Sequence, residues 1–132
     1  MMLPKHLYER LLANGQASLE TERDHTPVVK FFDPAGAATW LISELSPGDP
    51  DILFGLCDLG MGFPELGDVR FSELASTKNR LGIDLERDLY FVGKFPLSVY
   101  AEAARQHERI TEDEQHLKEA AHRLGLSDSP QT

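Results

Sequence analysis

The chain has 132 residues and a formal net charge of −9, with 22 acidic residues against 13 basic ones. This length fits a single domain of roughly 100–200 residues, and the 41% hydrophobic and 27% charged residues are those of a globular protein. The acidic balance argues against direct nucleic-acid binding, which depends on Lys and Arg neutralising phosphates. No apolar run reaches the ~18 residues of a membrane span, and the N-terminus has no apolar signal core. Together with a lone cysteine, Cys57, these features predict a cytoplasmic protein without membrane contact.

The first half of the chain predicts one helix followed by three strands. Leucines at helical spacing predict a helix over Pro4–Asn14, with Gly15 as its stop, and the polar residues 16–26 predict a loop. Runs of β-branched and aromatic residues predict the strands Pro27–Phe32, Ala38–Leu45 and Asp51–Asp58. The short link between the first two strands predicts an antiparallel hairpin. The third strand is almost continuously apolar, so it is expected in a central position covered on both faces.

The middle of the chain is rich in turn residues. Three glycines and a proline exclude a regular element from Leu59–Gly67. A short strand is expected at Asp68–Phe71, a helical turn at Ser72–Ser76 and a last strand at Asp88–Val92.

Two helices are predicted near the C-terminus. The first spans Leu97–Gln106 and is expected to be capped by Ser98. The second spans Thr111–Leu124, because Thr111 and Glu114 form a capping-box pattern. The tail after residue 126 is expected to fray. These elements together predict an α+β fold, with an antiparallel sheet of about four to five strands flanked by an N-terminal helix and two C-terminal helices.

Most of the negative charge lies between Asp33 and Glu73. This stretch has eight acidic residues and one basic residue, Arg70, so it accounts for −7 of the −9 charges. It also holds six of the ten glycines and four of the eight prolines. A concentrated acidic segment favours binding to a basic protein surface or a cation. The candidate binding surface consists of Glu44, Asp49, Asp51, Asp58, Glu65 and Asp68.

Catalytic sites are the alternative to this binding hypothesis. Carboxylates are suitable ligands for a divalent cation, and the alternative hypothesis is a cation-dependent hydrolase that uses Glu44, Asp58 and Glu65. The acidic spacing does not match an EF-hand, and turn chemistry already accounts for most of these residues. No catalytic residue and no resident cofactor is assigned. Cys57 lies in an apolar run, which favours a small buried side chain over a thiolate nucleophile.

Short segments along the chain together resemble a known family. They are Leu11–Gly15, Pro27–Lys30, Ala38–Leu41, Phe54–Gly60, Pro64–Gly67, Glu86–Asp88 and Pro96–Ser98. Their order and spacing are similar to the DUF2958 family, bacterial domains of unknown function in small proteins often carried by plasmids and conjugative elements. Family members often have Gly where this chain has Glu108. The resemblance covers roughly residues 3–110, so it implies one α+β domain over 1–110 and a helical extension with a frayed tail over 111–132.

The resemblance implies a setting but no active site, because the family has no established catalytic residues to carry over. Small accessory proteins of mobile elements blunt host defences or serve conjugation, and some anti-restriction proteins imitate the phosphate charge of DNA. We therefore expect a non-enzymatic accessory protein whose partner is a protein with a basic surface. A homodimer, formed through a strand edge or the last helix, is the remaining alternative.

Overall fold

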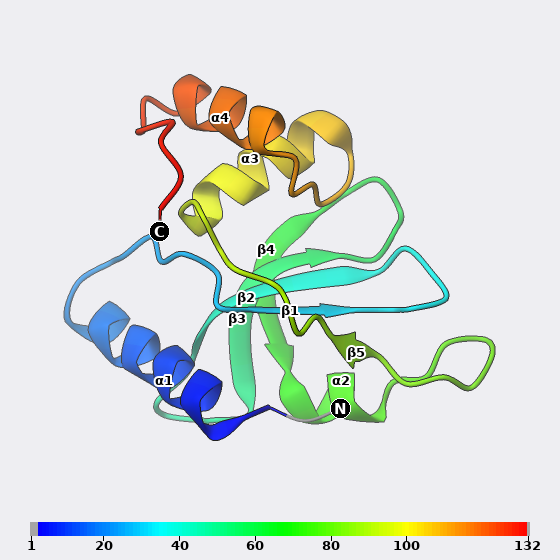
Figure 1. The fold of residues 1–132 in the computed structure, drawn as a ribbon. Coiled ribbons are helices and arrows are strands. Elements are labelled where there is room, and N and C mark those ends of the chain that lie inside the picture. Colours follow the sequence, from blue (N-terminus) through cyan, green and yellow to red (C-terminus); the bar gives the residue numbers. More distant parts are fainter. Residues whose placement is uncertain (1–2, 132) are drawn as a thin grey trace.

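The computed structural model describes residues 3–131. Helices and strands follow one another in a mixed order along the chain (Figure 1). The elements are α1 (Lys5–Glu20), β1 (Val29–Phe32), β2 (Thr39–Leu45), β3 (Ile52–Asp58), β4 (Glu65–Arg70), α2 (Phe71–Ser76), β5 (Glu86–Arg87), α3 (Leu97–His107) and α4 (Glu114–Arg123).

The strands form one antiparallel sheet of five strands in the order β4-β3-β2-β1-β5. β1 to β4 follow each other as neighbouring hairpins, and β5 returns to pair with β1. Figure 1 shows α1 on one side of the sheet and α3 with α4 on the other. The structure therefore confirms the predicted α+β class, the β1–β2 hairpin and the interior position of β3.

Hydrophobic side chains fill the space on both faces of the sheet. On the face that α1 covers, Leu11 packs with alternate strand residues such as Trp40 and Ile42. On the other face, Leu41 and Leu56 pack with α3 and α4. Because successive strand residues point to opposite faces, the continuous apolar run in β2 supplies both cores.

Helix α1 is longer than predicted. It continues through Gly15 to Glu20, so the expected loop over residues 16–26 begins only after Glu20. Gly15 does not end the helix; it is buried where the helix backbone meets β2. A Cβ atom at this position would lie 1.8 Å from the carbonyl oxygen of Leu45. The glycine therefore permits close packing of α1 on the sheet.

Two of the strand predictions are wrong. β4 begins at Glu65, inside the segment from which a regular element was excluded, because the turn is confined to the residues before it. Gly60 and Gly62 have φ values of 80° and 87° there. The strand predicted over Asp88–Val92 is a loop, and β5 precedes it. The Asp88 carboxylate accepts a hydrogen bond from the Tyr90 N–H, which favours a turn over an extended strand.

The caps of the last two helices differ from the predictions. Helix α3 starts at Leu97, as predicted, but Ser98 does not cap it. The Asp24 carboxylate accepts hydrogen bonds from the N–H and hydroxyl of Ser98. Helix α4 starts at Glu114 and is capped by Asp113, which accepts from the His116 N–H. The Thr111 hydroxyl contacts the His116 ring and accepts from the Asp113 N–H.

The chain after α4 runs back toward the sheet. The Gln131 N–H donates to the Lys94 carbonyl, and its side-chain oxygen accepts from the Thr26 hydroxyl. Within residues 3–131, no helix is both long enough and apolar enough to cross a bilayer.

Candidate functional site

A groove lies where the C-terminal end of α1 meets the sheet. It consists of two adjoining hollows of about 520 and 490 Å³, which share the lining residues Glu22, Arg23, Glu44 and Phe54. The first hollow extends along α1 and reaches Asp68 on β4. The second is bounded by the first residues of α3 and by Leu66 on β4. We call this feature the β4 groove.

The floor of the β4 groove is a row of side chains across three strands. Glu44 of β2 lies opposite Phe54 of β3, and Phe54 lies opposite Asp68 of β4. Residues opposite each other in neighbouring strands point to the same face of the sheet. The row therefore places an aromatic ring between two carboxylates. Among the described residues, neither carboxylate is within ion-pair distance of Lys or Arg.

A short chain of hydrogen bonds fixes the inner side of the groove. The Ser18 hydroxyl donates to Oε1 of Glu44 at 3.2 Å and contacts Nε2 of His25 at 3.0 Å. Because the hydroxyl proton goes to Glu44, Nε2 of His25 must be the donor to Ser18. These hydrogen bonds connect three parts of the fold: α1, the segment that precedes β1, and strand β2 itself. They therefore hold Glu44 in place in the groove.

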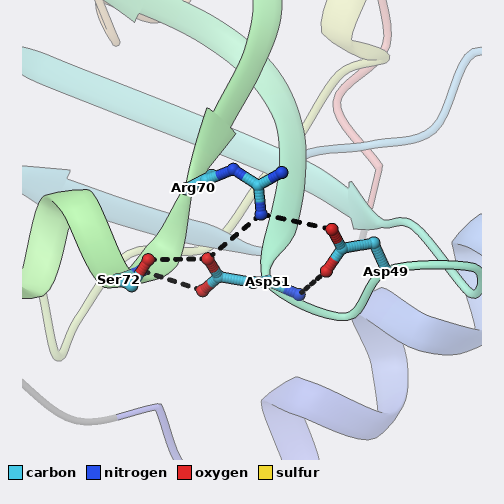
Figure 2. A network of polar contacts seen from close by, with 4 residues as sticks. All are labelled: Asp49, Asp51, Arg70 and Ser72. Atoms are coloured by element: carbon cyan, nitrogen blue, oxygen red, sulfur yellow. Dashed lines mark hydrogen bonds and ion pairs between the residues drawn. The ribbon is translucent and has the colours of Figure 1, made fainter.

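Unlike Glu44 and Asp68, the carboxylates of Asp49 and Asp51 form ion pairs with an arginine. Figure 2 shows both carboxylates turned toward Arg70. A guanidinium nitrogen of Arg70 lies 3.2 Å from Oδ2 of Asp49 and 3.5 Å from Oδ2 of Asp51. Asp51 also accepts two hydrogen bonds from Ser72, one from its N–H and one from its hydroxyl. The Ser72 hydrogen bonds, followed by Arg70, lower the pKa of Asp51. This network connects the start of β3 to the end of β4 and to α2, and it balances much of its own charge.

Asp58 is buried, with 3% of its surface exposed. One carboxylate oxygen accepts from the Gly60 N–H at 2.8 Å and the other from the Ile110 N–H at 2.9 Å. The carboxylate thus ties the end of β3 to the segment between α3 and α4. This position takes Asp58 away from the outward-facing surface on which it was expected.

Glu65 is exposed on β4 but does not face the groove. It lies opposite Cys57, whose side chain packs in the α1-side core. Glu65 and Asp68 therefore point to opposite faces of the sheet. Glu44, Asp58 and Glu65 do not converge, and residues 3–131 contain no group of three His, Cys, Asp or Glu side chains placed to hold a metal ion.

Cys57 has the environment of a structural cysteine. Burial raises the pKa of its thiol, and the nearby Asp68 carboxylate raises it further. Both effects disfavour the thiolate that nucleophilic chemistry requires.

A family model described as "Protein of unknown function (DUF2958)" matches residues 2–111. The chain belongs to the DUF2958 family. No curated protein and no solved structure matches it. The DUF2958 match includes the whole β4 groove, from Gly15 to Ser98, and ends before α4.

Two carboxylates of the groove, Glu44 and Asp68, were predicted from the sequence, but most residues that form the walls of the groove were not. Ser18, Arg23 and His25 fall in the segment that was predicted to be a loop. The spacing of Leu11, Gly15 and Ser18, at i, i+4 and i+7, was the signal that the helix continues with the same face inward. The contribution of Phe54 and Leu66 depends on strand register, and β4 itself was placed too late in the chain.

Proposed function

We propose that this DUF2958 protein binds a basic surface of another protein and has no catalytic activity of its own. The observation that carries the proposal is the row in the β4 groove. Glu44 and Asp68 flank Phe54 there and, among the described residues, pair with no Lys or Arg. A half-buried carboxylate, that of Glu44, and an exposed one, that of Asp68, lie beside an aromatic ring, and this arrangement favours a cationic side chain.

Other carboxylates of the acidic segment already have partners within the protein, so they are excluded from the proposed binding surface. Asp49 and Asp51 are bound by Arg70, and Asp58 is occupied by backbone N–H groups. We therefore confine the binding surface to Glu44 and Asp68, with Glu22 at the rim. Since Glu44, Asp58 and Glu65 do not converge, we do not propose cation-dependent hydrolysis.

The family membership supports a finer form of this proposal. We infer a cytoplasmic accessory role in a mobile-element setting, in which the partner is a host defence protein with a basic, nucleic-acid-binding surface. Such a surface is complementary in charge to the groove. The groove carboxylates occupy one small site, so imitation of a long stretch of duplex is not part of the proposal.

Affinity capture from a bacterial lysate tests the proposal. The immobilised protein is compared with the E44Q/D68N double variant at about 50 mM and about 500 mM salt, because screening weakens exposed charge pairs. We expect basic proteins to be retained at low salt, to be lost at high salt and to be captured less by the double variant. Asp128→Asn in the exposed tail is the matched control.

Two outcomes would contradict the proposal. One is that the wild-type protein retains no partner at either salt concentration. The other is that the double variant captures the same proteins to the same extent, which would place binding elsewhere.

A further inference from the structure

Strand β4 is an edge strand. The sheet order places it at one end, where among the described residues it pairs with β3 only. In an antiparallel pair, every second residue directs its N–H and C=O away from the partner. β4 therefore presents unpaired backbone groups along its length of six residues, whereas β5 at the other end has two residues. An exposed edge of this length is a template for an added strand.

Charged side chains are the protective device that β4 carries at this sheet edge. β4 contains no Lys and no Pro, and its register with β3 runs without a bulge. Its charged residues are Glu65, Asp68 and Arg70, and Arg70 is already bound to two aspartates. The charge left at this edge is negative. It disfavours a second copy of β4 and favours a basic segment.

We propose that an extended basic segment of the partner protein adds to β4 as a further strand of the sheet, with one Arg or Lys side chain seated in the β4 groove. This rests on the proposed function and specifies its binding mode. A residue opposite Asp68 would have its Cβ about 4.5–5.5 Å from that of Asp68. Its long side chain continues the row toward Phe54 and Glu44, so the cation lies over the Phe54 ring between the two carboxylates.

The neighbouring row defines a second recognition position. Leu66 lies opposite Leu56, on the same face as Asp68, and 48% of its surface is exposed. An apolar partner side chain opposite Leu66 would cover it. Because side chains repeat every second residue along a strand, the basic and the apolar residue of the partner must be separated by one residue.

Peptide binding followed by NMR tests this arrangement. The probe is a capped, threonine-rich peptide of about eight residues with one arginine and one leucine separated by a single residue. We expect shifts of the backbone amides of β4 on titration. Asp68→Asn should weaken binding roughly two- to fivefold, as for an exposed ion pair, and Asp128→Asn should leave it unchanged.

Two control peptides separate strand addition from charge attraction alone. One has the same composition with arginine and leucine adjacent, which sends the two side chains to opposite faces. The other carries N-methyl groups on the alternate residues whose N–H would face β4, so it cannot complete the backbone ladder. Strand addition requires both to bind much more weakly than the probe.

Equal binding of all three peptides overturns strand addition, even where lysate capture through Glu44 and Asp68 still succeeds. β4 amide shifts that change with protein concentration in the absence of peptide overturn it in favour of a second copy as the occupant. If lysate capture fails but peptide binding still depends on the spacing of arginine and leucine, the proposed class of partner is wrong. The edge of β4 is then still supported as the binding site.

Discussion

One residue of this protein, Glu108, has a strained backbone conformation. Glu108 follows α3 and adopts the left-handed conformation, with φ 57° and ψ 23°. Among the described residues it is the one non-glycine with positive φ. A glycine C-cap is the usual solution for a helix that ends this way. Glu108 therefore holds a backbone conformation that glycine would adopt without strain.

The variant Glu108→Gly should stabilise the fold by about 0.5–1 kcal/mol. A non-glycine residue in the left-handed region costs about 1–2 kcal/mol, and the added flexibility of glycine removes roughly 0.5–1 kcal/mol of that gain. The midpoint of urea unfolding is the measurement. The control Glu119→Gly, in the middle of α4, should cost about 1 kcal/mol. A loss of stability in Glu108→Gly would show that the glutamate side chain itself stabilises the turn.

At the scale of elements, the position of α1 depends on one close approach between backbones. Gly15 is buried in the middle of the helix, directly over the Leu45 carbonyl. The next turn carries Ser18 to Glu44 and so completes one wall of the β4 groove. The Asn14 side chain donates to the Ser43 carbonyl at 2.9 Å, which fixes the same contact from the side. The geometry of the groove therefore follows from how closely α1 lies on β2.

The variant Gly15→Ala tests this contact. Alanine is favoured over glycine inside a helix by about 0.8–1 kcal/mol, but its Cβ would lie 1.8 Å from a backbone oxygen that has no rotamer to change. We expect the clash to dominate and unfolding to become easier by roughly 1–3 kcal/mol.

Gly67→Ala is the matched control for Gly15→Ala, because a Cβ at Gly67 meets nothing within 4 Å. Its change should stay within about 0.5 kcal/mol. Thermal melts of both variants followed by circular dichroism give the comparison. Equal melting temperatures for the two variants would mean that α1 can move away from β2 at no cost.

At the level of the complete fold, helix α4, which lies beyond the DUF2958 match, belongs to the same core as the sheet. Leu117, Ala120 and Ala121 of α4 are buried together with Leu41 and Leu56 of the sheet. The second core, which contains Trp40, lies on the opposite face. A sheet shared by both cores should make the molecule unfold as one unit.

Leu117→Ala should therefore lower the stability that Trp40 fluorescence reports, although the two side chains belong to different cores. The side chain of Leu117 is 2% exposed, so we expect a loss of roughly 2–5 kcal/mol in urea unfolding. Leu124→Ala, at the end of the same helix and 40% exposed, should cost less than about 1 kcal/mol. An unchanged Trp40 transition in Leu117→Ala would mean that α4 unfolds independently.

Elements with local sequence signals were predictable from the residues alone. The β-branched and aromatic runs predicted β1, β2 and β3, and the short link between the first two predicted their hairpin. Apolar periodicity predicted α1, α3 and α4 to within a few residues at most ends. These features depend on residues close together in the chain, so composition and spacing suffice to find them.

Which acidic residues remain without a partner depends on contacts between distant segments of the fold. Nothing in the sequence distinguishes Asp58 from Asp68. In the fold Asp58 is buried and its carboxylate accepts the N–H of Ile110, from the segment after α3, whereas Asp68 is exposed. β4 has little strand propensity of its own and forms because β3 offers it an unpaired edge. Strand register then brings Glu44, Phe54 and Asp68 into one row. Contacts between distant segments set all of these outcomes, and local sequence patterns carry no record of them.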